Sequence, residues 1–147
     1  MRPLALIACG AALLGRDVEA QVSRRAPARC ERIATTTFEF GRTGGNIRST
    51  AVRVDTSGAI SRLVGAVWTP SESGVPRDAV MGLARIAWST AFTQLPSAPT
   101  KPTRNPDAAR DYIDVKSACG SKHVEAVPDA SAPAFRELLA LLRIATR

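Results

Sequence analysis

The sequence predicts an α+β fold, in which two helices cover one face of an antiparallel sheet and so form two layers. Several short segments alternate apolar and polar residues, a period of two that is typical of half-buried strands. Two longer segments place apolar residues every three or four positions, which is typical of amphipathic helices. These segments follow one another as strand, strand, a weaker third strand, helix, strand, strand and helix.

Residues 1–20 are typical of a secretory signal. Arg2 provides a positive start, residues 3–15 are apolar, and Val18 and Ala20 suit the narrow pocket of signal peptidase. The apolar run is too short for a transmembrane helix, which needs about 20 apolar residues. We expect cleavage after Ala20 and a secreted or periplasmic protein. In the alternative interpretation, the segment ending at Cys9 is a lipobox that attaches lipid there, although only eight residues precede this cysteine.

Residues 21–35 form a basic N-terminal arm that leads into the first strand, and residues 36–147 form a single domain. Two cysteines follow the signal, Cys30 and Cys119. An even pair in a small exported domain typically forms a disulfide, and we expect this bridge. Zinc binding is the weaker interpretation, because closed zinc sites take four ligands and the chain has one histidine.

The first strand is expected from Thr36, Phe38 and Phe40, which share one face. The glycines of residues 41–46 are expected to end it in a turn, since glycine adopts positive φ without steric cost.

Residues 49–55 alternate again and form the second strand. Its side chains are expected inward at Thr50, Val52 and Val54, and outward at Ala51, Arg53 and Asp55. Asp55 and Gly58 have the positions favoured in a type I turn, so residues 59–64 are expected to return as a strand. Residues 65–75 are expected to be a loop, with Trp68 against the sheet.

The first helix is expected to run from Pro76 to Leu95. Proline suits the first helical position, and Asp78 lies in the first turn, where negative charge is favourable. One continuous apolar stripe follows, made of Val80, Leu83, Ala84, Ala87, Trp88, Ala91, Phe92 and Leu95. The proline-rich residues 96–109 are expected to be an exposed loop, although their Pro-x-x-Pro spacing is also found in ligands of binding grooves.

Residues 111–117 and 122–127 are expected to form the last two strands, joined through residues 118–121. The closing helix is expected to start at Ser131 or Ala132. It buries a stripe made of Phe135, Leu138, Leu139 and Leu142.

No catalytic constellation is evident. His123 and Glu125 point to the same side of a strand, which suits either a partial metal site or base–acid pair, or simply two polar residues on a solvent face. Asp111 and Asp114 lie three apart, so they point to opposite faces and cannot act as a carboxylate pair. The sequence lacks a Gly-x-Ser-x-Gly elbow, and Gly44-Gly45 lacks the lysine of a phosphate loop. We expect no enzyme activity, no metal and no cofactor.

The net charge of +7 has two interpretations. In the first, it results from codon bias towards arginine and keeps the protein soluble. In the second, it attracts the protein to an anionic lipid, polysaccharide or acidic protein. Nucleic acid is not an expected partner, because export removes the chain from most of it.

Several segments together resemble the emfourin family. They are FEFGRTGG at 38–45, the strand ending in DTSG, AFTQLP at 91–96, the strand DYIDV, KHVEAVPD and the closing SAPAFRELLALL. The resemblance spans about residues 36–143 and implies a small α+β protein that inhibits thermolysin-like zinc metallopeptidases by protein–protein contact. The chain departs from the family pattern at 59–75, at 96–109 and in its two cysteines.

The leading expectation is therefore a non-catalytic, secreted or periplasmic binding domain, for which the resemblance implies a role as a metallopeptidase inhibitor. Its contacts are expected to come from loops on a rigid scaffold. The candidate contact residues are Arg42, Gly44, Gly45 and Asn46 in the glycine turn, and Lys101 and Arg104 in the proline-rich loop. The alternative expectation is an envelope-associated accessory domain that binds anionic polymer through its arginines.

Overall fold

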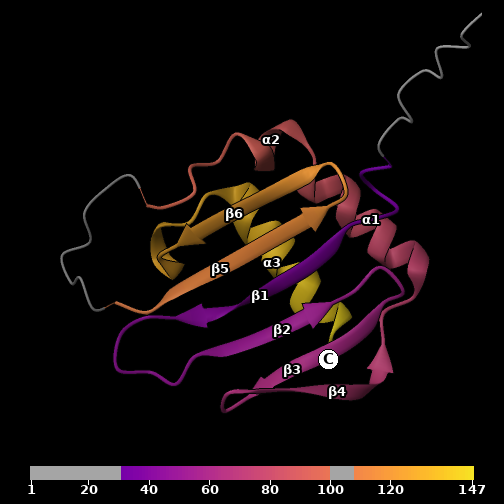
Figure 1. Ribbon diagram of the computed structural model, residues 1–147. Helices are drawn as coiled ribbons and strands as arrows, with labels where there is room; N and C mark the ends of the chain where they lie inside the picture. The colour runs from indigo at the N-terminus through magenta and orange to yellow at the C-terminus, as the bar shows by residue number, and fades with distance from the viewer. Residues whose placement is uncertain (1–30, 100–107) are drawn as a thin grey trace, which may run out of the picture.

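The computed structural model describes residues 31–99 and 108–147, which form an α+β domain. Its sheet has six antiparallel strands in the order β4-β3-β2-β1-β5-β6 (Figure 1). The strands are β1 (Thr37–Thr43), β2 (Thr50–Val54), β3 (Ala59–Val64), β4 (Val67–Gly74), β5 (Arg110–Ser117) and β6 (Gly120–Ala126).

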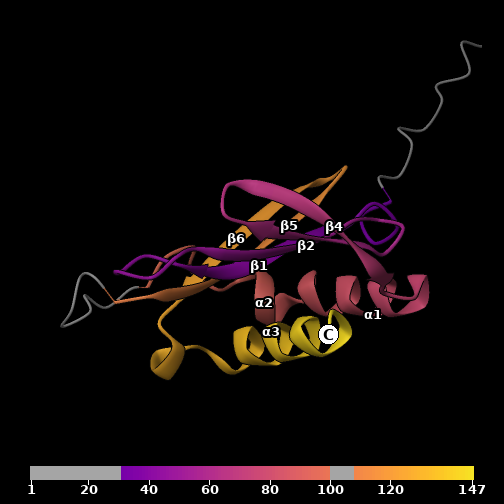
Figure 2. The ribbon, with the colours of Figure 1, turned by 90° about the horizontal axis from the view of Figure 1, so that it is seen from below.

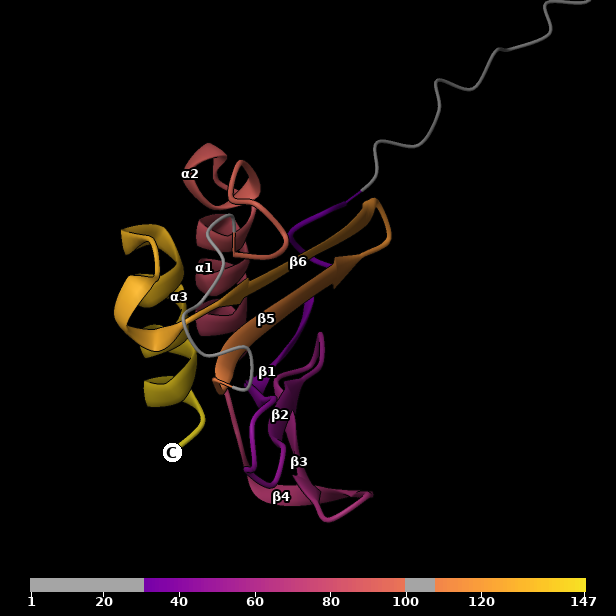
Figure 3. The same cartoon turned by 90° about the vertical axis from the view of Figure 1, so that its left-hand side faces the viewer.

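The helices all lie on one face of the sheet, which we call the inner face (Figures 2 and 3). They are α1 (Arg77–Ala87), the short α2 (Thr90–Thr93) and α3 (Pro133–Ala145), which follows a 3-10 turn, η1 (Pro128–Ala130). Pro133 stands at the start of α3 with Ala132 as the N-cap residue, as expected. No helix of residues 31–99 and 108–147 lies over the other face of the sheet, which we call the outer face.

The hydrophobic core fills the space between the inner face and the helices. Phe38 and Phe40 on β1 and Ile113 and Val115 on β5 are at most 3% exposed, and Phe92, Phe135, Leu138 and Leu142 close the core from the helical side. The alternation expected for β1 and β5 is therefore confirmed.

The segment expected to be a loop at residues 65–75 is instead strand β4, so that prediction is wrong. Val64 pairs with Val67 across a two-residue turn, and Gly65 has a φ of 66°. Glycine at the first turn position allows a tight hairpin whose twist matches that of the strands. The hairpin forms although Pro70 lies within β4, because β4 is an edge strand, where proline is tolerated.

The prediction of a single helix over residues 76–95 is also wrong, since α1 ends at Ala87 and α2 starts at Thr90. Ser89 between them has extended backbone angles (φ −65°, ψ 155°). The Trp88 indole N–H donates to the hydroxyl of Thr36 at 2.9 Å, and the ring lies 4.8 Å from the guanidinium carbon of Arg32. The break thus occurs where Trp88 is held by the residues that precede β1.

Gly41 does not end the first strand, contrary to expectation, because β1 continues to Thr43. Gly41 is paired with Ala51 on one side and Tyr112 on the other, and a Cβ there would lie 1.9 Å from the Thr50 carbonyl oxygen. Glycine is therefore required at this position for close strand approach. Positive φ occurs instead at Gly44 (80°) and Gly45 (64°).

The inward and outward pattern expected for β2 follows from the register, which places Thr50, Val52 and Val54 on the face of Phe38 and Phe40. Burial departs from it at two positions. Ala51 points outward and is nonetheless 5% exposed, and Thr50 points inward but is exposed, because it lies at the end of the strand.

Candidate binding surfaces

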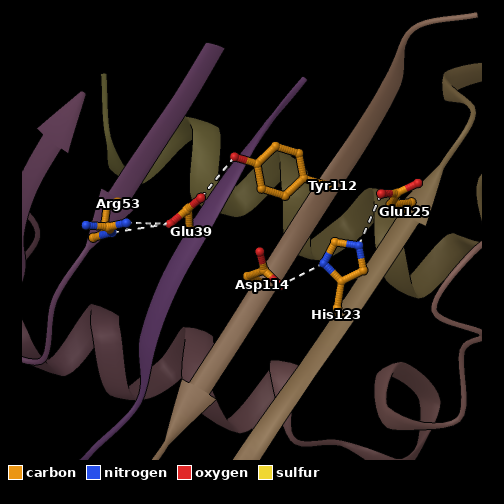
Figure 4. A network of polar contacts seen from close by, with 6 residues as sticks. All are labelled: Glu39, Arg53, Tyr112, Asp114, His123 and Glu125. Carbon is orange, nitrogen blue, oxygen red and sulfur yellow. Dashed lines mark hydrogen bonds and ion pairs between the residues drawn. The ribbon is translucent and has the colours of Figure 1, made fainter. Parts of the chain in front are cut away.

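The outer face carries a network of polar side chains that spans four strands (Figure 4). Glu39 on β1 accepts hydrogen bonds from Arg53 on β2 at 2.7 Å and from the hydroxyl of Tyr112 on β5 at 3.2 Å. The register causes this arrangement, because it places Glu39 directly between Arg53 and Asp114. The guanidinium carbon of Arg53 also lies 4.1 Å from the ring centre of Trp68, which extends the network to the β4 edge.

His123 forms the other half of the network. Its Nδ1 lies 2.7 Å from Asp114 Oδ1, its Nε2 lies 3.3 Å from Glu125 Oε1, and its ring stacks near Tyr112 with 6.3 Å between ring centres. Glu125 also accepts from Arg110 at 3.2 Å. Desolvation lowers the pKa of His123, but the hydrogen bonds and attraction from Asp114 and Glu125 together outweigh it and raise that pKa above its ordinary value.

The contact between Asp114 and His123 was not predicted from the sequence. Residues 118–121 were expected to join the two strands, whereas the hairpin turns over Ala118 and Cys119 alone and pairs Ser117 with Gly120. That shorter turn shifts the register and places Asp114 opposite His123. A two-residue turn followed by Gly120, with its φ of 136°, is the signal that would have found the pair.

The arrangement around His123 is suited to charge balance more than to metal binding. The two carboxylates meet opposite edges of the ring, one at each nitrogen, so the three side chains do not converge on one point (Figure 4). Within residues 31–99 and 108–147, no group of three or more His, Cys, Asp and Glu side chains could hold a metal ion. The partial metal site considered for His123 and Glu125 has no support here.

A second charged cluster lies on the inner face. Asp111 is 3% exposed, and its Oδ1 accepts from Arg42 Nε at 3.0 Å and from Arg143 of α3 at 3.1 Å. The hydrogen bond to Asp111, and then the attraction between the charges, raise the pKa of Arg42. Arg42, predicted as a contact residue, thus also helps to fasten α3 to the sheet. Asp111 and Asp114 point to opposite faces, as expected.

The glycine turn and the β3–β4 turn lie at the same end of the sheet, at the left of Figure 1. We call residues 44–49 and 64–67 the loop end. Gly44, Gly45 and Asn46 are all exposed there, as a contact role requires. Three large apolar side chains at the loop end are also exposed, namely Ile47 (42%), Val64 (64%) and Val67 (66%).

These three apolar residues were not predicted as contacts. Among the described residues, the only other large apolar side chain that is exposed is Ile144, on the last turn of α3. The Val-Gly-Ala-Val segment at 64–67 could have indicated a hairpin tip, because glycine stands between two β-branched residues.

Lys101, Arg104 and Cys30 lie outside the described residues, so their predicted roles stay predictions. Cys119 lies half-buried in the β5–β6 turn. The amide of its neighbour Ala118 donates to the hydroxyl of Thr35 at 3.0 Å, which brings the segment before β1 against this turn. That proximity is what the predicted Cys30–Cys119 bridge needs.

No family model and no curated protein matches the chain. A search of the described helices for one with the length and apolar character to cross a membrane found none.

Proposed function

We propose that the chain is an exported, non-catalytic protein-binding domain that uses the loop end as its contact surface. The observation that carries the proposal is the exposure of Val64 and Val67, which pair across the β3–β4 turn, with Ile47 also exposed in the glycine turn at the same end of the sheet. Neighbouring exposed apolar side chains on loops, such as Val64 and Val67, are typical of recognition surfaces, whereas single scattered ones are common on any protein.

The proposed target is a thermolysin-like zinc metallopeptidase, which follows from the resemblance to the emfourin family. The loop end suits such a role because two short connections present side chains from four paired strands. A surface held in this way loses little conformational entropy when it binds.

An inhibition assay tests the proposal. The protein is added to thermolysin and, as a comparison, to serine and cysteine peptidases, and we expect inhibition of thermolysin alone. The double variant Val64→Ser/Val67→Ser removes two apolar contacts and is expected to weaken inhibition by about tenfold or more, as for residues at the centre of an interface. The control Ile144→Ser removes an equally exposed apolar side chain from α3 and is expected to leave inhibition unchanged.

Absence of inhibition at micromolar protein across thermolysin-type enzymes would refute the metallopeptidase target. Equal weakening by the double variant and by Ile144→Ser would instead refute the loop end as the contact surface.

The second candidate is binding of anionic envelope polymer. Arg48, Arg77 and Arg85 are exposed, and none makes an ion pair with another described residue. Retention on an anionic matrix should then fall steeply as salt rises from 0.05 M, since exposed charges are screened. Retention that does not depend on salt would exclude this candidate.

A further inference from the structure

A recess of about 260 Å³ opens on the inner face beside the loop end. Five of the residues that line it have side chains on the inner face, namely Phe40 on β1, Thr50 and Val52 on β2, and Arg62 and Val64 on β3. Its floor is completed by the intervening residues Gly41, Ala51 and Leu63. The walls are thus largely apolar, and Arg62 supplies the one charged group among the lining residues.

The charges around the recess are unbalanced. Arg62 donates to the Thr146 carbonyl oxygen and makes no ion pair with any carboxylate of the described residues. Arg42 lies directly across from Thr50, a lining residue, and shares the single carboxylate of Asp111 with Arg143. Arg62 is therefore the guanidinium group that lines the recess without a carboxylate partner among the described residues, whereas Arg42 and Arg143 are both paired with Asp111.

We propose that this recess binds an apolar side chain of the partner protein that stands next to a carboxylate. The apolar side chain lies against Val52 and Val64, and the carboxylate pairs with Arg62. Charge complementarity favours this occupant, because a carboxylate offsets the charge of Arg62, which has no ion-pair partner among the described residues, and arginine binds carboxylates in paired geometry. The inference rests on the proposed protein-binding function and specifies the chemistry of its partner.

Short peptides test the recess without the partner. The probe is N-acetyl-leucyl-aspartate amide, and its matched control is N-acetyl-leucyl-asparagine amide, which differs only in charge. In an NMR titration we expect the aspartate peptide to shift the methyl signals of Val52 and Val64 and the Nε signal of Arg62, with millimolar affinity. The asparagine peptide should bind about tenfold more weakly, the loss expected for one charge-assisted hydrogen bond. Equal shifts with both peptides would overturn the proposal. The absence of shifts with either peptide at about 20 mM would also overturn it.

Two variants with matched controls locate the site. Thr50→Phe fills the recess from an exposed strand position and should abolish the shifts, whereas Ser73→Phe, at the far end of β4, should keep them. Arg62→Gln should weaken binding of the aspartate peptide alone, whereas Arg85→Gln, at an exposed position on α1, should leave binding of both peptides unchanged. Unchanged signals of Tyr112 and His123 verify that each variant is folded. Retention of full binding by Thr50→Phe would place the peptide elsewhere and overturn the proposal.

These results are separable from the proposed function. Peptide binding that Thr50→Phe removes, in a protein that inhibits no metallopeptidase, supports the recess and refutes the target. Inhibition that Thr50→Phe leaves intact, without peptide binding, supports the target and refutes the recess.

Discussion

Asp111 and Asp114 lie three residues apart on β5, point to opposite faces of the sheet and differ in burial and in the residues they bind. Asp111 is almost fully buried and holds two arginines, one from β1 and one from α3. Asp114, with 26% of its side chain exposed, holds His123 of the neighbouring strand. One carboxylate joins two layers of the fold, and the other joins two strands within one layer.

The difference between the two faces is one of dielectric environment. A buried charge is stable only with partners, so removing its partner leaves a costly unpaired group. An exposed pair is screened by water and contributes little to stability. The inner face should therefore tolerate few substitutions, and the outer face should tolerate many.

The largest contrast is expected between Phe38 and Glu39, adjacent residues of β1 that point to opposite faces. Phe38→Ala leaves a cavity in a core position that is 1% exposed and should lower the free energy of unfolding by about 4 kcal/mol. Glu39→Ala removes an exposed ion pair to Arg53 and a part-buried hydrogen bond from Tyr112, and should cost about 1 kcal/mol. Urea denaturation measures both, and similar losses would show that the outer face is part of the stabilising core.

The next contrast is between the two aspartates. Asp111→Asn leaves Arg42 and Arg143 without a negative partner and should cost about 3 kcal/mol, the lower end of the range for a broken buried pair, because both guanidiniums are partly exposed. Asp114→Asn should cost about 0.5 kcal/mol. The same denaturation experiment compares them, and a smaller loss for Asp111→Asn than for Asp114→Asn would contradict the comparison.

The elements of the fold were largely predictable because their apolar periodicity is local. Phe38 and Phe40, or Leu138, Leu139 and Leu142, mark their buried faces within a few residues. Strand β4 was not predictable in this way, since Val67–Gly74 is mostly exposed and lacks alternation. The break after Ala87 was not predictable either, because the apolar stripe continues through it, and the Trp88 beside it donates a hydrogen bond to Thr36, which lies 52 residues earlier.

The surfaces were less predictable, because they depend on register and on which segments remain uncovered. Glu39 and Tyr112 are 73 residues apart, and only the β1–β5 pairing brings them together. The turn at 41–46 was identified from its glycines, but Ile47 and Val64 are ordinary apolar residues whose exposure follows from where the helices stop. The recess beside Arg62 requires the positions of three strands and has no signal in the sequence.

A smaller effect is expected from Tyr112, the only tyrosine in the chain. Its burial, and then the negative charge and hydrogen bond of Glu39, raise the pKa of its hydroxyl well above the ordinary value. Absorbance at 295 nm during an alkaline titration reports this one group, so the midpoint should lie above pH 10. Glu39→Gln should lower the midpoint, and an unchanged midpoint would show that Glu39 does not act on the phenol.

The smallest effect is expected from His123, the only histidine. Its folded-state pKa is raised, so its contribution to stability is fully present below the unfolded pKa of about 6.5 and is lost as pH rises through the higher folded value. Because 42% of the side chain is exposed, the change in stability across this range should be below about 1 kcal/mol. The NMR signal of the ring Cε1 proton gives the pKa directly. Asp114→Asn should bring that pKa down, whereas Asp111→Asn, on the opposite face of the same strand, should leave it unchanged, and equal shifts in the two variants would mean that the faces are not electrostatically separate.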